Sequence, residues 1–347
     1  MVAILLSMAA VAACADADET PPGTRLPALP LDPDAVTVSG VSSGGAMAVQ
    51  FHTAHSSLVQ GAGVFAAPPY YCAEGAIGNA LGRCMTDGAN IPVDALMQHA
   101  DRFAGEGAID PVAGLSDDRV WLYRGTADPH VHVSVMDALE RYYRTRIQGP
   151  NLLRIEREGA AHNFPTAMSG GSPCDSSEPP YLASCGHDAA REMLSHLYGP
   201  LVPNAPSTAL APLQPFDQRP YAAAAGSVAF ADQGWLYVPA ACSTGAEVQC
   251  RLHVVFHGCK QGVGAVGDAF ARRAGYLEVA ETNRIVVLFP QVKPTMQPLN
   301  PLGCWDWWGY EGTDYVTKRG RQIATVRAMV GAVLGEAPQG SSDARAP

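Results

Sequence analysis

The chain has 347 residues, of which 47% are hydrophobic and only 16% are charged, and its formal net charge is −10. This length can bury the core of one large α/β domain or of two small domains. An acidic balance without any Lys/Arg-rich run argues against nucleic acid and anionic membranes as binding partners.

The first 13 residues are apolar, and acidic residues follow them. Such a segment is too short to cross a bilayer comfortably and is typical of a signal peptide, so we expect an exported protein. Residues Val11 to Cys14 also resemble a bacterial lipobox, which would make Cys14 the lipidated N-terminus of a membrane-anchored lipoprotein in the periplasm or outer membrane. The alternative is cleavage at an ordinary small-residue site, with secretion from the cell. Residues 14–34 form an acidic, proline-rich lead-in.

The next part of the chain alternates strand-like and helix-like segments. A predicted strand at 35–39 leads through a glycine-flanked serine into a helical pattern at 46–54. Further helices are predicted at 92–105, 136–146 and 187–198, and further strands at 120–124 and from residue 151 onward. This alternation indicates a parallel sheet that is covered by helices on both faces.

A Pro/Ala/Leu-rich stretch at 199–215 is aperiodic and is interpreted as a surface crossing. Strands then resume at 216–221, 234–240, 251–258 and 284–292, and two helices are expected at 269–282 and 320–334. The last two strands are continuous apolar runs, as expected at the centre of a parallel sheet. We therefore predict one catalytic domain over residues 35–336 and a disordered tail over 337–347. Two separate domains are the alternative.

The pattern G-x-S-x-G occurs as Gly40-Val41-Ser42-Ser43-Gly44, between the first predicted strand and helix. It is the nucleophile-elbow pattern of α/β-hydrolases. In that fold several strands precede the elbow, yet here the elbow follows the leader almost directly. The C-terminal third supplies suitable strands, one of which ends in VVFHG and resembles the oxyanion-loop strand of esterases. We therefore predict a circularly permuted α/β-hydrolase fold with a mostly parallel sheet.

Acyl transfer requires a nucleophile, a base and an acid that orients the base. Ser42 is the candidate nucleophile, because its glycine neighbours allow the tight turn from strand to helix. The fold places the acid and the base after later strands, in the order Ser, Asp, His. Asp128 follows the strand at 120–124 and His162 follows the next strand, so we predict these two residues as acid and base. His130 lies too near Asp128 in sequence to occupy the separate loop that the base requires.

The oxyanion of the tetrahedral intermediate needs two preorganised hydrogen-bond donors. The backbone N–H of Ser43 is expected to be one of them, because it directly follows the nucleophile. The backbone N–H of Cys259, in the sequence FHGCKQ, is expected to be the second. This chemistry uses no cofactor, and no C-x-x-C pair or Cys/His cluster has the spacing of zinc ligands.

Beyond Cys14 the chain contains eight cysteines, and an even number in an exported chain suggests disulfides. Their spacing favours pairing between neighbours, which would leave the last two to close a long loop. The expected pairs are Cys72–Cys84, Cys174–Cys185, Cys242–Cys250 and Cys259–Cys304. The last pair would tie the predicted oxyanion loop to the tryptophan-rich segment CWDWWGY.

Six motifs resemble those of the single-domain extracellular poly(3-hydroxybutyrate) depolymerases: GVSSGGAMAVQ, PPYYCA, RGTADPHV, GAAHNFPT, HGCKQ and NPLGCWDWWGY. That group includes fungal enzymes with a circularly permuted α/β-hydrolase fold, and the resemblance covers about residues 35 to 335. It implies hydrolysis of poly(3-hydroxyalkanoate) by a serine-esterase mechanism. It also implies the roles given above for the triad and the oxyanion donors, and it places Trp307 at the substrate crevice.

The segment CWDWWGY holds three of the five tryptophans. Dense aromatic residues often form core, which we expect for Trp305 or Trp308, while Trp307 faces the substrate. The sequence departs from many bacterial relatives in that no separate polymer-binding domain fits here. A lipobox would also be unusual for an enzyme that is released to degrade granules.

We therefore expect an exported carboxylic-ester hydrolase that acts as a monomer on poly(3-hydroxybutyrate), its oligomers or a small ester. No cofactor, metal or nucleic acid is expected to take part. The nearest alternative is a feruloyl or acetyl esterase of plant-wall carbohydrates, because such enzymes share the elbow and the triad. A catalytically inactive binding lipoprotein is a further alternative, against which the complete Ser/Asp/His set argues.

Overall fold

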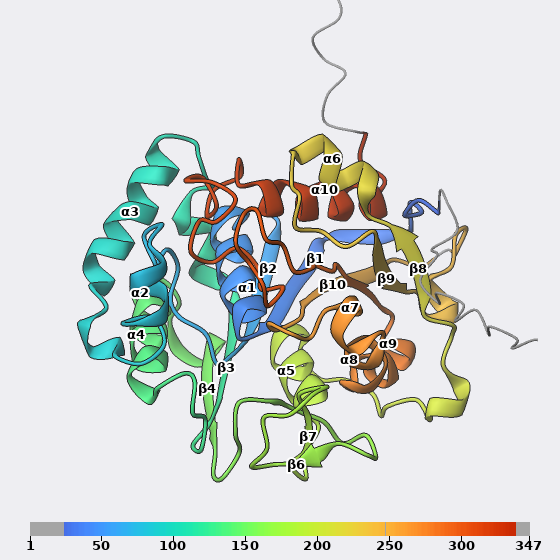
Figure 1. The fold of residues 1–347 in the computed structure, drawn as a ribbon. Coiled ribbons are helices and arrows are strands. Elements are labelled where there is room, and N and C mark those ends of the chain that lie inside the picture. The colour runs from blue at the N-terminus through green and yellow to red at the C-terminus, as the bar shows by residue number, and fades with distance from the viewer. Residues whose placement is uncertain (1–23, 247, 338–347) are drawn as a thin grey trace, which may run out of the picture.

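The computed structural model describes residues 24–337 with the exception of residue 247. An eight-stranded sheet forms its centre (Figure 1). Its strands are β1 (Leu31–Val41), β2 (Val59–Phe65), β3 (Arg119–Gly125), β4 (Leu152–Arg157), β8 (Gln214–Asp217), β9 (Gln233–Tyr237), β10 (Cys250–Phe256) and β11 (Ile285–Phe289). They lie in the order β4-β3-β2-β1-β10-β11-β9-β8. Neighbours from β4 to β11 are parallel, and β9 runs antiparallel to both β11 and β8.

The strand that leads into the G-x-S-x-G turn lies in the middle of this sheet. Strand β1 pairs with β2 on one side and with β10 on the other, and the β1–β10 register joins Val36 to Leu252 and Gly40 to Phe256. Strands from late in the chain therefore occupy the positions that precede the elbow in an ordinary α/β-hydrolase. This confirms the predicted permutation, because both halves of the chain build one continuous sheet.

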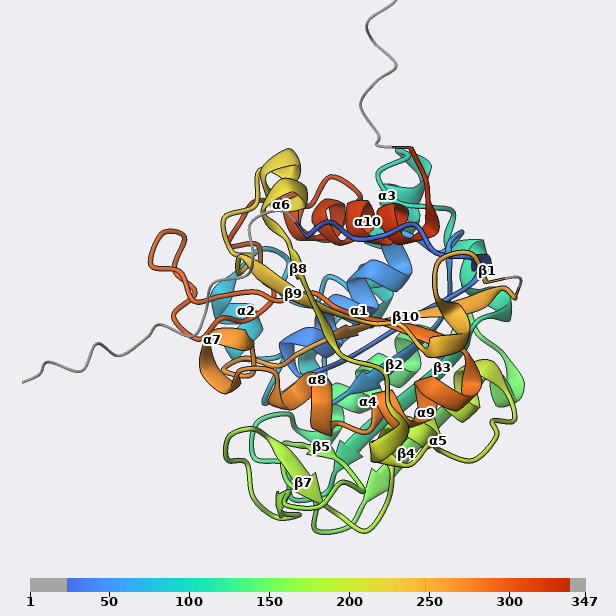
Figure 2. The same cartoon turned by 90° about the vertical axis from the view of Figure 1, so that its right-hand side faces the viewer.

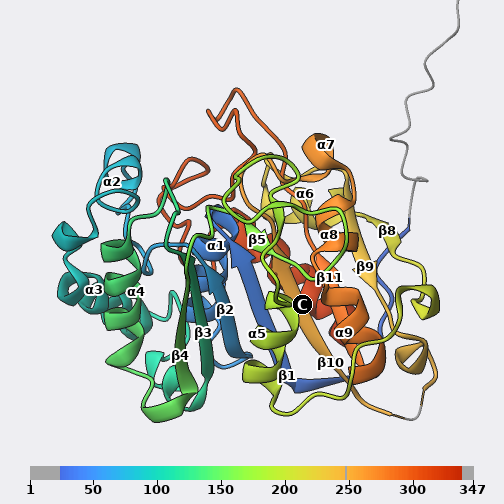
Figure 3. The ribbon, with the colours of Figure 1, turned by 90° about the horizontal axis from the view of Figure 1, so that it is seen from below.

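Helices cover both faces of the sheet (Figures 2 and 3). One face carries α1 (Ser43–Ala54), α3 (Val93–Gly105), α4 (Val133–Arg144) and α10 (Arg321–Leu334), and the other carries α5 (Ala189–Tyr198), α8 (Ala269–Arg273) and α9 (Tyr276–Asn283). The shorter helices are α2 (Ile77–Leu81), α6 (Arg219–Ala225) and α7 (Val263–Val266), and a small sheet is formed by β5 (Phe164–Pro165), β6 (Ser172–Pro173) and β7 (Leu182–Ser184).

The apolar strands are buried on both sides, because successive side chains point to opposite faces. In β10, Val254 belongs to the core under α1, whereas Val255 belongs to the core under α5 and α9. Helix α1 is buried along its whole length, so its sequence shows no polar face. The strand-like runs of the sequence thus build a core on both faces of the sheet, and α1 is a fully buried helix of one of these two cores.

Two segments differ from the sequence-based expectation. The helix expected at 269–282 is wrong in its middle, because Gly275 adopts a left-handed φ of 92° and separates α8 from α9. A Cβ at this position would also lie 3.2 Å from Asp188 Oδ1. The strand expected at 216–221 ends at Asp217, and Arg219 begins helix α6, where the alanine run at 222–225 favours helix over strand.

All four predicted disulfides are present. Three of them close short loops, and Cys259–Cys304 bridges a sequence separation of 45 residues. Disulfides persist in oxidising compartments, so these four fit an exported protein. Within the described part of the chain, no helix combines the length and apolar character that crossing a membrane requires. The predicted signal peptide, Cys14, the first part of the lead-in up to residue 23 and the tail from residue 338 lie outside the described residues.

Candidate active site

Ser42 lies at the sharp turn between β1 and α1. Its backbone adopts φ 58° and ψ −120°, a strained conformation for a residue other than glycine, and its N–H donates to the carbonyl of Phe65 at 2.8 Å. The side chain is partly exposed at the carboxyl edge of the sheet. These features are the strand–turn–helix setting that the elbow pattern predicts.

Two glycines make this turn possible. A Cβ at Gly40 would lie 2.2 Å from the carbonyl oxygen of Gly44. A Cβ at Gly44 would lie 2.2 Å from the carbonyl oxygen of Phe256 and 2.4 Å from that of His257. The first turn of α1 therefore packs directly on the end of β10, which brings the predicted nucleophile next to the predicted oxyanion loop.

Ser43 is the first residue of α1 and is almost completely buried. Backbone N–H groups in the first turn of a helix have no acceptor within the helix, and the helix dipole favours negative charge there. The Ser43 hydroxyl accepts the N–H of Trp305 at 3.4 Å. The backbone N–H of Ser43 is therefore suited to the oxyanion role predicted for it.

The loop after β10 is held by a buried histidine and a glutamine. His257 Nε2 accepts the N–H of Val292 at 3.1 Å, so its Nδ1–H donates to the carbonyl of Gly258 at 2.7 Å. Burial lowers the pKa of His257 to about 4, so the ring is neutral. Gln261 Oε1 accepts the N–H of Gly258 at 2.8 Å. These contacts, with the Cys259–Cys304 disulfide, fix the backbone at Cys259.

Asp128 and His162 follow the neighbouring strands β3 and β4, and their side chains are hydrogen-bonded. His162 Nδ1 lies 2.8 Å from Asp128 Oδ2, and Asp128 Oδ1 accepts the N–H groups of His130 and Val131 at 2.8 and 2.9 Å. Burial alone would raise the pKa of Asp128, but the hydrogen bond from His162 and the two backbone N–H groups bring it below its ordinary value. The carboxylate is therefore ionised and leaves His162 Nε2 available as a base.

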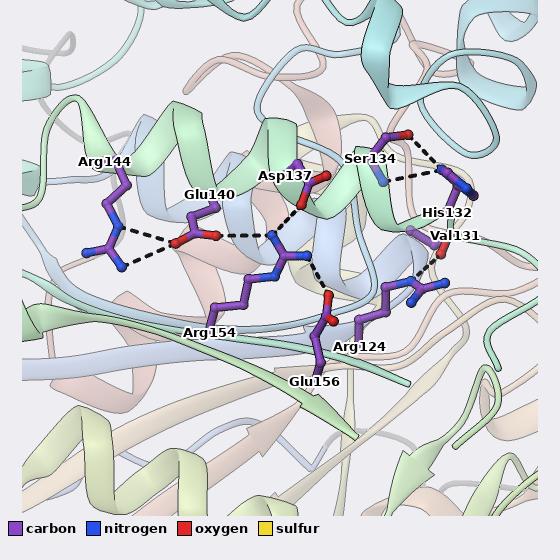
Figure 4. Close-up of polar contacts among 9 residues, drawn as sticks. All are labelled: Arg124, Val131, His132, Ser134, Asp137, Glu140, Arg144, Arg154 and Glu156. Atoms are coloured by element: carbon purple, nitrogen blue, oxygen red, sulfur yellow. Dashed lines mark hydrogen bonds and ion pairs between the residues drawn. The ribbon is translucent and has the colours of Figure 1, made fainter. Parts of the chain in front are cut away.

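The turn that carries Asp128 is closed by an arginine that the sequence did not single out. Arg124 is buried, and its Nε–H donates to the carbonyl of Val131 at 2.8 Å (Figure 4). The peptides on both sides of Val131 are thus held, one by Asp128 and the other by Arg124. Arg124 is the first residue of the motif RGTADPHV, but the sequence alone did not indicate its contact with Val131.

Arg154 secures the strand that precedes His162. Its guanidinium on β4 forms ion pairs with Asp137 at 2.6 Å and Glu140 at 3.1 Å, both on α4, and with Glu156 (Figure 4). Helix α4 follows the Asp128 turn, so this network connects the helix after the predicted acid to the strand that precedes the predicted base.

A groove of about 610 Å³ opens at Ser42. Ser43, Cys259, Cys304 and Trp307 line it together with Ser42, and Val131 extends its wall toward the Asp128 turn. Trp305 is fully buried and Trp307 is 9% exposed, so the first is core and the second forms part of the groove wall. Trp308 also lines the groove, so of Trp305 and Trp308 it is Trp305 that lies in the core.

The groove also has an apolar rim, which we define as Ile77, Leu81, Leu299 and Leu302. These side chains are 49%, 58%, 63% and 44% exposed, respectively. The sequence did not reveal them, because they come from α2 and from the loop before Cys304 and share no periodic pattern. Exposed apolar side chains gathered around one opening are typical of a binding surface.

Asp306 organises the tryptophan-rich loop. Its carboxylate accepts the backbone N–H groups of Gly309 at 2.7 Å, Tyr310 at 2.9 Å and Glu311 at 2.9 Å. Burial nevertheless raises the pKa of Asp306 to about 6. The carboxylate thus holds the turn that presents Trp307 and Trp308 to the groove.

The predicted site residues gather at one edge of the sheet: Ser42, Ser43, Cys259 and Trp307 in the groove, and Asp128 with His162 on the adjoining loops. Their catalytic and binding roles remain predictions. Within residues 24–246 and 248–337, no group of three or more His, Cys, Asp or Glu side chains could hold a metal ion.

Comparisons with known proteins give a consistent set of relatives, although no family model matches the chain. The chain is 43% identical over 307 residues to the poly(3-hydroxybutyrate) depolymerase of Delftia acidovorans, a match that covers 88% of this chain and 61% of that protein. The chain thus spans less than two thirds of this relative. It is 33% identical over 319 residues to the polyhydroxybutyrate depolymerase of Talaromyces funiculosus, covering 88% of this chain and 91% of that protein.

Solved structures agree with the sequence comparison. The crystal structure of PHB depolymerase from Penicillium funiculosum matches with a TM-score of 0.83 and 31% identity, over 90% of this chain and 99% of that one. A PHB depolymerase variant complexed with an R3HB trimer matches equally well, with the same TM-score, identity and coverage. The fold described above is therefore shared along nearly the whole of those chains.

Proposed function

The chain belongs to the poly(3-hydroxybutyrate) depolymerase family, and on this premise we propose that it is an exported serine esterase that hydrolyses the ester bonds of poly(3-hydroxybutyrate) or its oligomers. One observation carries the proposal: among the described residues, no charged side chain lines the groove at Ser42. A polyester of hydroxyacids is neutral along its length and offers only methyl groups and carbonyls. An uncharged groove with an apolar rim suits such a chain.

In the proposed mechanism Ser42 Oγ attacks the ester carbonyl carbon while its proton passes to His162 Nε2. The backbone N–H groups of Ser43 and Cys259 stabilise the oxyanion, and losing one such donor typically costs about 3 kcal/mol. The tetrahedral intermediate collapses as His162 returns the proton to the leaving alcohol oxygen. Water then attacks the acyl-enzyme with His162 as base, which releases the acid and restores Ser42. Asp128 keeps the imidazole in the required tautomer throughout.

The polar groups of the groove argue against a carbohydrate ester as substrate. The Asn300 amide is occupied by the backbone of Cys304 and by the hydroxyl of Tyr310. That hydroxyl in turn donates to the carbonyl of Cys304 and accepts from Gln322. Sugar recognition needs several unoccupied hydrogen-bonding groups, and these two side chains are already satisfied within the protein.

The proposal is tested by comparing three substrates with the purified protein: 3-hydroxybutyrate trimer, amorphous poly(3-hydroxybutyrate) granules and methyl ferulate. We expect hydrolysis of the trimer and of the granules, with little release of ferulate. Faster hydrolysis of methyl ferulate than of the trimer would overturn the depolymerase assignment in favour of the feruloyl esterase.

We propose that the apolar rim supplies contact with the polymer surface, since burial of apolar area contributes about 25 cal/mol per Å². Leu299→Ser should therefore weaken binding to granules more than it slows hydrolysis of the soluble trimer. Val202→Ser is the matched control, because Val202 is 54% exposed and lies outside the groove lining. Equal granule binding by both variants would show that the apolar rim does not contribute to binding of the polymer.

Lipidation at Cys14 and a monomeric state remain predictions. If the lipobox is used, the mature protein fractionates with membranes and carries an acyl mass shift that Cys14→Ser abolishes. A soluble protein that begins at another residue would favour ordinary secretion. Sedimentation of the purified chain tests the monomeric state.

A further inference from the structure

Lys260 has an unusual position beside the proposed oxyanion loop. It follows Cys259, is exposed, and adopts a left-handed φ of 59° while its N–H donates to the carbonyl of Leu302 at 2.7 Å. The chain has three lysines, and the other two form ion pairs, Lys293 with Asp232 and Lys318 with Asp110. Lys260 has no carboxylate partner among the described residues. Lys260 therefore places a positive charge without a carboxylate partner next to Cys259, in a chain whose net charge is −10.

Lys260 lies on the same side of the site as His162. Its neighbour Gln261 donates from Nε2 to the carbonyl of Pro180 at 3.0 Å. In the same loop, which the Cys174–Cys185 disulfide closes, the hydroxyl of Ser177 accepts the backbone N–H of His162 at 3.0 Å. The loop at 174–185 is thus hydrogen-bonded to the neighbour of Lys260 at one point and to the backbone of His162 at another.

His130 is a second side chain beside the proposed base. Its ring packs edge-on against His162 with 5.1 Å between ring centroids, and it is exposed. Burial of part of the ring lowers the pKa of His130, and the charges of His162 and Lys260 lower it further, whereas Asp128 raises it. The loop at 174–185 thus connects the Lys260 segment to His162, and the ring contact places His130 beside the same histidine; we call Lys260 and His130 the polar shelf, and neither residue lines the groove.

The chemistry of the substrate indicates which of its two fragments lies beside the polar shelf. In a chain of 3-hydroxyacids, the acyl side of each ester leads to the hydroxyl end and the alcohol side leads to the carboxyl end. The alcohol oxygen takes its proton from His162, so the carboxyl-end fragment must leave on the His162 side. If the scissile ester is the last one, only three bonds separate the leaving oxygen from the carbon of a free carboxylate.

We propose that Lys260, with His130 beside it, binds the free carboxylate of the leaving 3-hydroxyacid unit, so that the enzyme cleaves oligomers preferentially at their carboxyl end. This inference rests on the proposed function and defines the leaving-group side of the same site. The acyl fragment, which carries no charge, lies in the groove with Trp307. The carboxylate is the one charge that the substrate possesses, and Lys260 is placed to meet it.

The test compares 3-hydroxybutyrate trimer as the free acid with its methyl ester, which lacks the charge. For Lys260→Met, the ratio of kcat/KM for acid over ester should fall about two- to fivefold at low salt, the range expected for an exposed ion pair. Lys260→Arg should keep the ratio, and 0.5 M NaCl should shrink the difference between wild type and Lys260→Met. Lys293→Met is the matched control and should leave the ratio at the wild-type value.

Product analysis provides a second readout. From the tetramer acid, the wild type should first release monomer from the carboxyl end, and Lys260→Met should release a larger share of dimer. His130→Gln should shift the ratio in the same direction by a smaller factor. An unchanged acid-to-ester ratio in Lys260→Met, or an equal change in Lys293→Met, would overturn the inference. Failure of the wild type to hydrolyse either trimer would instead refute the proposed function.

Discussion

Gly44 in the first turn of α1 approaches the carbonyl oxygen of Phe256 so closely that a Cβ at position 44 would lie 2.2 Å from it. This contact joins the nucleophile turn to the strand that leads into the oxyanion loop. The two parts come from segments that are far apart in the sequence. The position of Ser42 relative to Cys259 therefore depends on this contact between Gly44 and Phe256.

Gly44→Ala should therefore damage both folding and catalysis. Overpacking of this kind costs about 1–3 kcal/mol of stability, and any relief by movement of α1 would displace Ser42. We expect a lower melting temperature, together with a kcat on the soluble trimer that is reduced at temperatures where the variant is folded. Gly105→Ala is the control, because a Cβ there meets no atom within 4 Å. Wild-type kcat in Gly44→Ala would contradict the proposed contact.

The lowered pKa of Asp128 predicts how the stability of the protein depends on pH. Its pKa in the folded protein lies below the ordinary value of about 3.9, so the unfolded chain takes up the proton first as pH falls. The stabilisation from Asp128 is fully present above about pH 4 and is lost as the pH falls through the folded pKa. The difference in free energy of unfolding between wild type and Asp128→Asn should thus shrink from pH 6 to pH 3.

Activity offers an independent check on Asp128. In serine hydrolases the corresponding amide substitution lowers kcat by a factor on the order of 10⁴, because the imidazole adopts the wrong tautomer. Asp128→Asn should show a loss of this kind at neutral pH with its fold intact by circular dichroism. A loss below tenfold would remove Asp128 from the triad.

The Cys259–Cys304 disulfide should matter more for activity than the other bridges. In the loop-entropy model it stabilises the fold by about 4 kcal/mol, compared with about 2.5 kcal/mol for the short Cys242–Cys250 loop. The paired serine variant at 259 and 304 should lose kcat at temperatures where it remains folded, since the backbone at position 259 is released. The paired variant at 242 and 250 serves as control. Equal activities would reduce Cys259–Cys304 to a structural bridge.

Trp307 should distinguish the polymer from small substrates. Trp307→Ala widens the groove and removes apolar contact with the acyl chain. Hydrolysis of granules and of the trimer should therefore fall far more than hydrolysis of a small activated ester. An equal loss on all three substrates would make Trp307 structural. No loss on any of them would place it outside the working part of the groove.

Much of this arrangement could be predicted from sequence, for identifiable physical reasons. The elbow at Ser42 has a local signature, because the turn requires glycine at fixed positions. The placement of Asp128 and His162 on neighbouring loops could be predicted because the loops that follow parallel strands lie at one edge of the sheet. The short disulfides could be predicted because their cysteines are neighbours in sequence.

Other features depend on contacts between distant segments and leave no local pattern. Arg124 acts through the carbonyl of Val131, a contact that exists only once the Asp128 turn has formed. The apolar rim combines a short helix with a loop more than 200 residues later in the chain. The break at Gly275 also escaped prediction, because the helical pattern continues on both sides of this residue and only the structure shows its left-handed φ.

We propose that Ser42 forms the acyl-enzyme, and covalent labelling would identify the nucleophile itself. Wild type and Ser42→Ala are treated with a serine-directed phosphonate, and the modified residue is located by fragmentation of the peptide that contains Ser42 and Ser43. We expect one adduct, on Ser42, with no adduct and no trimer hydrolysis in a folded Ser42→Ala variant. Labelling of another residue in the wild type, or trimer hydrolysis by Ser42→Ala at the wild-type rate, would contradict it.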